Sequence, residues 1–296
     1  MPPVQVRGEV LARRRMGAYH LLEIAAPGVA DSARPGQFVT VTVGGPATSM
    51  LLRRSFAIYR ATPVGAYSGT VTIVVAVHGR GTEWLAGLRQ GDQLDVVGPL
   101  GTPFQLPATP AGCVLVGGGY GSAALFGLAD ALAARGCRAD FVLGAATADR
   151  LFGELEAKRA AASVTVTTDD GSAGVAGLVT DQLPEVLDKT GALWVYACGP
   201  MPMLRAVGTV AASRGLPCQV AVEESMACGI GVCMTCVLPV VGDDGETRMT
   251  RSCVDGPVFR ADQVRWADLG TVPPDAVGAP AMAAAAAAVG AVGGGA

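Results

Sequence analysis

Four cysteines near the C-terminal end constrain the fold more than any other feature of this chain. Cys228, Cys233 and Cys236 lie in the stretch CGIGVCMTC. The fourth, Cys253, follows after sixteen further residues. A C-x4-C-x2-C run with a distant fourth cysteine is the ligand order of plant-type [2Fe–2S] clusters. We therefore expect a loop that wraps three thiolates around one end of a cluster, and a returning strand that brings the fourth.

The residues between the cysteines fit such a loop. Gly229 and Gly231 have no side chain, so the backbone can bend sharply and bring its N–H groups close to sulfide. Ile230, Val232 and Met234 alternate with the glycines. We expect these three apolar side chains to keep the loop dry, which helps to set the potential of a cluster.

A structural zinc site is the alternative interpretation of the four cysteines. Structural zinc usually uses two short pairs of Cys or Cys/His ligands. Here only one pair has that spacing, one cysteine lies four residues before it, and the fourth stands alone. The pattern favours an iron–sulfur cluster, and metal analysis separates the two.

Composition narrows the class of protein. A chain of 296 residues, half of them apolar, can build two domains with cores of their own. The net charge of −3 without a long basic run argues against a nucleic-acid partner. The first twenty residues have no apolar signal-peptide core, so the eight cysteines are expected to be reduced thiols of a cytoplasmic protein. The uncharged Ala/Gly-rich end, within 271–296, predicts a disordered, low-complexity tail and no membrane anchor.

Residues 1–107 predict an antiparallel β-barrel. Short runs rich in β-branched residues are separated by Gly and Pro, and only 82–88 predicts a brief helix. The expected strands are 4–11, 19–24, 38–43, 71–77 and 93–97, and a further strand begins at 52–58.

Two stretches of this barrel suggest anion binding. Arg53 and Arg54 stand at the start of a strand, where an arginine can neutralise a pyrophosphate; a solvated basic edge is the alternative. The turn 78–82, HGRGT, leads into the short helix, and backbone N–H groups at a helix start can hold phosphate. An ordinary turn capped by Thr82 is the alternative there.

After a proline-rich linker at 106–110, residues 111–223 alternate between strands and helices. This pattern predicts a doubly wound parallel sheet. The expected strands are 113–116, 139–143, 164–167, 193–197 and 219–222, and the expected helices are 123–134, 150–160, 178–187 and 201–213.

Ligands of such sheets bind at the carboxyl ends of the strands, and we expect a dinucleotide there. GGGYGS at 117–122 departs from the dinucleotide fingerprint, but its glycines can admit a pyrophosphate to the helix that follows; a tight turn without a ligand is the alternative. CGP at 198–200 ends the fourth strand, where a nicotinamide would lie, although Cys198 also suits a plain buried thiol. The TDDG loop at 168–171 suits either ligand binding or capping. The expected nucleotide-binding residues are Gly117, Gly118, Gly119, Gly121, Cys198, Gly199 and Pro200.

The order of these modules is informative, with a cluster module at 224–270 directly after the sheet. It resembles the ferredoxin reductase superfamily and, more narrowly, the electron-transfer subunits of the two-subunit, NAD-linked dihydroorotate dehydrogenases. The matching stretches are RRSFAI at 53–58, GRGT at 79–82, GGGYG at 117–121, TDDGS at 168–172, ACGPMPML at 197–204, EESMACGIGVCMTC at 223–236 and CVDGPVF at 253–259.

This resemblance implies that FAD lies in the barrel. The positions that it assigns to FAD are Arg54, Ser55, Phe56, Ala57, Val74, Val75, Ala76, Gly81 and Thr82. One departure concerns Ala57, which stands where the family commonly has Ser or Thr, so a backbone amide would have to replace that hydroxyl. The resemblance also favours NAD over NADP.

The resemblance further implies a partner. Electrons would pass from FMN in a dihydroorotate-oxidising subunit through [2Fe–2S] and FAD to NAD⁺, in a heterotetramer of two plus two chains. No acid or base of this chain need be catalytic, because its role is to position cofactors. Two alternatives remain: a flavin/iron–sulfur reductase that serves another partner, such as a hydrogenase- or sulfide-type system, and a zinc-stabilised nucleotide-binding module.

Overall fold

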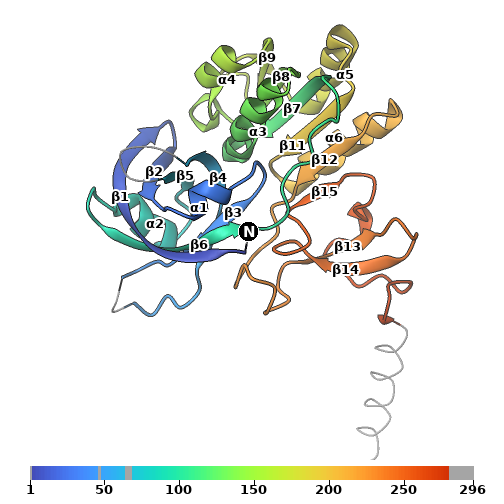
Figure 1. Ribbon diagram of the computed structural model, residues 1–296. Helices are drawn as coiled ribbons and strands as arrows, with labels where there is room; N and C mark the ends of the chain where they lie inside the picture. The colour runs from blue at the N-terminus through green and yellow to red at the C-terminus, as the bar shows by residue number, and fades with distance from the viewer. Residues whose placement is uncertain (1, 46–47, 64–68, 280–296) are drawn as a thin grey trace, which may run out of the picture.

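The structure is a computed structural model that describes residues 2–45, 48–63 and 69–279. Its N-terminal part is a closed barrel with strand order β1-β2-β5-β4-β3-β6, in which neighbouring strands are antiparallel (Figure 1). The elements of this part are β1 (Val4–Met16), β2 (Tyr19–Ala25), α1 (Val29–Ser32), β3 (Phe38–Val41), β4 (Arg54–Thr62), β5 (Thr70–Ala76), α2 (Arg80–Gly87) and β6 (Gln93–Leu100). The predicted barrel is thus confirmed.

Alternation along β5 shows how the barrel separates core from surface. Val71, Ile73 and Val75 are fully buried in the barrel interior. Val74 and Ala76 point to the opposite face, as the two-residue period of a strand requires. That outer face of β5 is turned toward the rest of the chain, where Val74 packs in the core that it shares with the sheet.

The second part is a seven-stranded sheet with the order β10-β9-β8-β7-β11-β12-β15, in which only β15 is antiparallel to its neighbour. Its strands are β7 (Gly112–Gly118), β8 (Arg138–Ala145), β9 (Ser163–Thr168), β10 (Val175–Ala176), β11 (Trp194–Cys198), β12 (Cys218–Ala221) and β15 (Val258–Arg260). Its helices are α3 (Ala123–Ala134), α4 (Glu154–Ala160), α5 (Val179–Thr190) and α6 (Met201–Ser213).

The helices cover both faces of this sheet, so the predicted doubly wound arrangement is confirmed. Alternate residues of β7 enter different cores: Cys113 and Leu115 pack with α3, whereas Val114 and Val116 pack with α5 and α6. A strand that is buried on both faces carries apolar side chains throughout. This explains the unbroken apolar run CVLV at 113–116, in β7.

The predicted helix at 150–160 begins later than expected, at Glu154. Gly153 precedes it in a left-handed conformation, with φ +76°. A Cβ at this position would lie 2.2 Å from the ring of Phe126. The close approach of that ring and the left-handed turn together delay the helix until after the glycine.

The third part is a hairpin of β13 (Val237–Val241) and β14 (Thr247–Arg251), which follows the cysteine-rich loop. The chain then returns to the large sheet as β15, which pairs with β12. The boundary predicted after residue 223 therefore separates β15 from the other strands of the same sheet. Sequence patterning missed β15 because three residues are too few to show a period.

Part of the expected tail is packed on this hairpin. Asp275 forms an ion pair with Arg265 at 2.6 Å, and the Val277 N–H donates to the Thr247 carbonyl at 2.9 Å. Residues 280–296, on which the rest of the tail prediction falls, lie outside the described residues. No helix among the described residues is long and apolar enough to cross a membrane.

One polar cluster joins the barrel to the sheet part. Arg60 of β4 forms ion pairs with Asp130 of α3 and Glu156 of α4. The Tyr59 hydroxyl donates to Glu156 as well. The Tyr59 ring packs edge-on against Phe152, with ring centroids 5.4 Å apart. These contacts fix how the two parts face one another.

We expect Arg60→Met to lower the free energy of unfolding by about 1 kcal/mol, because two partly exposed ion pairs are lost while the apolar stem is kept. Urea denaturation followed by circular dichroism measures this loss. Arg159→Met is the control, since Arg159 is an exposed arginine on the same helix as Glu156. An equal loss in both variants would show that the cluster does not stabilise the fold.

Candidate functional site

Two cavities lie beside the junction of the barrel and the sheet. The first, called here the barrel cavity, has a volume of about 410 Å³ and lies between β4 and β5 on one side and the loop after β12 on the other. The second, the edge cavity, has a volume of about 440 Å³ and lies at the carboxyl ends of β7, β8, β9 and β11. That edge is where open α/β sheets bind ligands.

Most residues assigned to FAD by resemblance line the barrel cavity. They are Arg54, Ser55, Phe56, Ala57, Val74, Ala76 and Thr82. Val75 instead points into the barrel core, where it is fully buried. Gly81 lies beneath the side chain of Arg54, where a Cβ would stand 3.0 Å from Nε. Ala57 has no hydroxyl to offer to this cavity, but Ser55, two residues before it, lines the same cavity and does carry one.

The two arginines at the start of β4 have different surroundings. Arg53 forms an ion pair with Asp95 of β6, so its charge is used within the barrel. Arg54 Nη1 donates to the Leu52 carbonyl at 2.6 Å, and its guanidinium has no carboxylate partner among the described side chains. Arg54 therefore keeps its charge available to an anion in the barrel cavity.

The glycine-rich turn before α2 is a capped helix start. Thr82 Oγ1 accepts from the backbone N–H groups of His78 at 2.9 Å and Gly79 at 3.2 Å. The N-cap is Gly79 rather than Thr82, and Thr82, the third residue of α2, supplies only the reciprocal bond of a capping box. Since Thr82 also lines the barrel cavity, the cap holds its side chain at the cavity wall.

The residues expected to bind a nucleotide are divided between the two cavities. Gly118, Gly119 and Pro200 line the edge cavity. Gly121 and Cys198 line the barrel cavity instead. The sequence analysis did not single out three further residues of the edge cavity, which are Thr167, Met203 and Ala206.

Close packing explains several of these glycines. A Cβ at Gly117 would lie 2.4 Å from the Ser122 side chain. A Cβ at Gly121 would lie 2.7 Å from the Gly199 Cα, and one at Gly199 would lie 3.0 Å from the Gly118 Cα. These glycines let the loops after β7 and β11 touch, and only Gly118 and Gly119 leave backbone exposed to the edge cavity.

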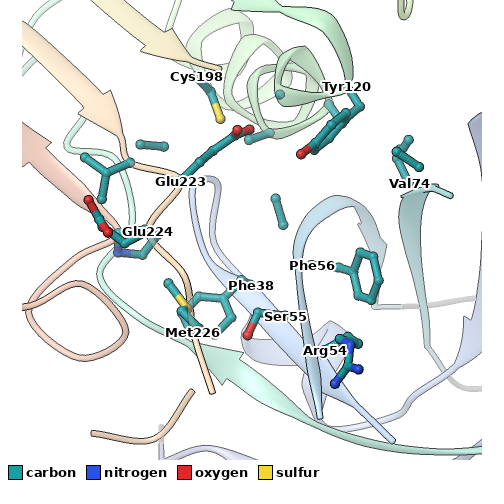
Figure 2. A pocket seen from close by; sticks show the side chains of 18 of the residues that line it. Phe38, Arg54, Ser55, Phe56, Val74, Tyr120, Cys198, Glu223, Glu224 and Met226 are labelled. Atoms are coloured by element: carbon teal, nitrogen blue, oxygen red, sulfur yellow. The ribbon is translucent and has the colours of Figure 1, made fainter. Parts of the chain in front are cut away.

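Tyr120 and Glu223 form a wall that both cavities share. Figure 2 shows them with Cys198 at one end of the barrel cavity, away from Arg54. Burial raises the pKa of Glu223. Burial, and then the nearby Glu223, raise the pKa of Tyr120 to about 12 and that of Cys198 well above its usual range. At neutral pH the phenol and the thiol are therefore protonated.

Sequence reasoning named neither Tyr120 nor Glu223 as a site residue. A signal was present, because Glu223 stands just beyond β12 at the carboxyl edge of the sheet. Tyr120 is the only side chain larger than a hydroxymethyl in GGGYGS, so it was hidden within a motif that was interpreted through its glycines.

The cysteine loop has the conformation that its glycines predict. Gly229 and Gly231 are left-handed, with φ +71° and +82°. Backbone N–H groups of Ile230, Val232 and Cys233 point at the Cys228 sulfur, at 3.5, 3.4 and 3.5 Å. N–H donors of this kind stabilise a thiolate.

The four cysteines are arranged as two pairs. Cys228 adjoins Cys233 on the outer side of the loop, and Cys236 adjoins Cys253 in a buried apolar cluster with Phe38. Within the part of the chain that the structure describes, no three potential ligands converge on a point that would hold a single ion. Two pairs suit a binuclear cluster, in which each iron takes two thiolates, better than one tetrahedral zinc.

The expectation that apolar residues keep this loop dry is wrong for the chain as described. Ile230, Val232 and Met234 are 54%, 75% and 52% exposed. Gly229 and Gly231, on either side of Ile230, have left-handed backbones, and Met234 is itself left-handed at φ +59°. The loop therefore presents an apolar surface.

The cysteine loop also forms part of the barrel cavity's surroundings. Met226, two residues before Cys228, lines this cavity (Figure 2). A Cβ at Gly229 would lie 3.6 Å from Ser55 Oγ, which reaches the cavity from β4. The site for a cluster and the site for a flavin thus share a wall.

Comparison with known proteins gives the family. Residues 223–265 match the family model of the iron–sulfur cluster binding domain of dihydroorotate dehydrogenase B. The electron transfer subunit of dihydroorotate dehydrogenase B (NAD(+)) from Geobacillus thermodenitrificans is 42% identical, over 85% of this chain and 95% of that protein. The corresponding subunit from Desulforamulus reducens is 34% identical, over 83% and 92%. This chain belongs to the dihydroorotate dehydrogenase B electron transfer subunit family.

Solved structures agree with the family assignment. A chain from an NADH-dependent reduced ferredoxin-NADP oxidoreductase superimposes with a TM-score of 0.77 at 32% identity, over 89% of this chain and 91% of that one. The ferredoxin reductase of carbazole 1,9a-dioxygenase has a TM-score of 0.62 at 21% identity, over 73% and 68%, and shows the same fold. The predicted resemblance to ferredoxin reductases is confirmed.

We expect Glu223→Gln to stabilise the chain at neutral pH. The folded chain holds the Glu223 proton to higher pH than the unfolded chain, so the wild type loses stability as pH rises through the raised pKa. Glutamine removes this loss, and the gap in melting temperature should be present at pH 8 and close at pH 4. Glu9→Gln, on the exposed face of β1, is the control. A gap that is independent of pH would contradict the burial of Glu223.

Proposed function

We propose that this chain is the electron transfer subunit of an NAD-linked dihydroorotate dehydrogenase, and that it connects an FMN-containing partner to NAD⁺ in pyrimidine biosynthesis. The observation that carries the proposal is the shared wall between the cysteine loop and the barrel cavity, at Met226 and Gly229. A one-electron cluster and a flavin exchange electrons only when they lie close together. The two sites of this chain meet that requirement.

The barrel cavity is the proposed FAD site. When bound, FAD exchanges electron pairs with NAD and single electrons with an iron–sulfur cluster. Arg54 supplies an unpaired guanidinium for the pyrophosphate, as its lack of a carboxylate partner allows. Tyr120 and Cys198, both held protonated, enclose the opposite end without adding charge.

The edge cavity is the proposed NAD site. Gly118 and Gly119 offer exposed backbone to a pyrophosphate. Asp169, at the end of β9, also lines this cavity. A carboxylate there can accept from a ribose 2′-hydroxyl and repel a 2′-phosphate, which favours NAD over NADP. Because Tyr120 and Glu223 line both cavities, the reacting ends of the two cofactors would meet at this wall.

The cysteine loop is the proposed [2Fe–2S] site, with Cys228 and Cys233 on one iron and Cys236 and Cys253 on the other. The apolar side chains of this loop are exposed, and we propose that the partner docks on them. In this proposal dihydroorotate oxidation belongs to that partner, in keeping with the relatives' name of electron transfer subunit. A heterotetramer of two plus two chains is part of the proposal.

A cytoplasmic location also belongs to this proposal. All eight cysteines lie among the described residues and are free thiols. Thiols in this number persist in a reducing compartment.

A second candidate is a subunit of an electron-bifurcating reductase. The ferredoxin-NADP oxidoreductase chain that superimposes at 32% identity comes from a structure described in terms of flavin-based electron bifurcation. The partner decides between the two candidates. Co-expression with a dihydroorotate-oxidising flavoprotein should yield a stable complex that reduces NAD⁺ with dihydroorotate, whereas this chain alone should be inert toward dihydroorotate.

We expect Cys233→Ser to abolish the cluster and leave FAD bound, because the barrel cavity does not include this residue. NADH reduction of an artificial dye should persist, while transfer between partner and NAD⁺ stops. Iron and flavin analysis measures both contents. Cys137→Ser, at a buried thiol outside the cluster loop, is the control. Joint loss of iron and flavin would contradict the separation of the two sites.

We expect Val232→Asp to weaken binding of the partner at least tenfold, because a carboxylate replaces the most exposed apolar side chain of the cysteine loop. Iron content should not change, since Val232 is not a ligand. Val175→Asp is the matched control, at another exposed valine, on β10. Titration calorimetry with the purified partner measures both variants, and equal affinities would place the interface elsewhere.

A further inference from the structure

A buried hydroxyl group without a hydrogen-bond partner marks a place where a group other than the described residues can bind. Among those residues there are three, on Thr40, Thr167 and Ser252. Leaving such a group unpaired costs about 1–3 kcal/mol, so native chains seldom do so without a reason. Thr167 lines the edge cavity, and Ser252 directly precedes Cys253. Thr40 is the third, and its surroundings point to a ligand.

Thr40 lies on the face of β3 that is turned toward the cysteine loop. Its neighbours Val39 and Val41 are fully buried in the barrel interior, so Thr40 and Phe38 point to the opposite side. Phe38 packs there with Cys236 and with Cys253. Thr40 itself is only 1% exposed.

The side chain of Thr40 abuts the first turn of the loop. A Cβ at Gly229 would lie 2.4 Å from Thr40 Cγ2, so the threonine occupies the space beside the residue that follows Cys228. Across the sheet Thr40 pairs with Ser55, which lines the barrel cavity. Thr40 therefore stands between the proposed flavin wall and the proposed cluster.

The acceptor for this hydroxyl is not a protein atom. Thr40 Oγ1 has no partner among the described residues, cysteine sulfurs included. The Thr40 methyl is the group that meets Gly229, and the hydroxyl beside it is left for a sulfur of the cluster that this loop would hold, with an ordered water as the competing acceptor. Hydrogen bonds to cluster sulfurs stabilise the extra negative charge of the reduced state and so raise the reduction potential.

We propose that the Thr40 hydroxyl donates a hydrogen bond to a sulfur of the [2Fe–2S] cluster and holds its reduction potential above the value that the cysteine loop alone would give. This inference rests on the proposed function, since it requires the cluster. It makes Thr40 a positioning and tuning residue of the barrel, outside the cysteine motif.

The test uses the complex of this chain with its partner, purified anaerobically. Thr40→Val removes the hydroxyl and keeps the shape, Thr40→Ser keeps the hydroxyl, and Thr40→Ala is a second variant without the hydroxyl should valine not load iron. Thr190→Val is the control, because it removes a hydroxyl on α5, at a residue that lines neither cavity and is not part of the cysteine loop. Iron and flavin per chain, the EPR spectrum of the reduced cluster, and its midpoint potential in an EPR-monitored titration are measured.

We expect the valine or alanine variant to hold full iron and flavin, with a more negative midpoint potential and an altered EPR spectrum. The serine variant and Thr190→Val should keep the wild-type potential. A wild-type potential in iron-loaded Thr40→Val or Thr40→Ala, or an equal shift in Thr190→Val, would overturn the inference alone. Wild-type protein without iron would overturn the proposed function as well.

Discussion

The contact between the cysteine loop and the outer face of the barrel is the constraint on which the rest of the arrangement depends. Gly229 has no room for a side chain because Thr40 of β3 fills that space. The chain can approach so closely only with a left-handed glycine at this position. This one close contact sets the cysteine loop against the strands that line the barrel cavity, so the two sites lie side by side.

Close packing at glycines also explains why the site is divided into two cavities. The loops after β7 and β11 touch through Gly121 and Gly199. Their contact leaves Tyr120 and Glu223 as the partition between the barrel cavity and the edge cavity. Burial keeps the Tyr120 phenol protonated at neutral pH and raises the pKa of the Glu223 carboxyl.

Much of this arrangement could be predicted from the sequence. Helices 123–134 and 201–213 begin and end where expected, because each lies between clear turn signals and strands. The cysteine spacing pointed to the cluster loop, and the start of a strand pointed to Arg53 and Arg54 alike, of which the resemblance chose Arg54. What could not be predicted depends on tertiary contacts. Only the fold shows that Arg53 is paired with Asp95 while Arg54 is not, or that Val75 faces the core.

The short strand β15 has a consequence for how electrons move through this chain. It follows the last cysteine and pairs with β12, which leads directly to Glu223 at the partition. The segment that contains the cysteine loop is thus connected at both ends to strands of the sheet, and the loop itself packs against β3 of the barrel. The hydrogen bonds of the sheet therefore hold the loop, and any cluster on it, at a fixed place beside the partition.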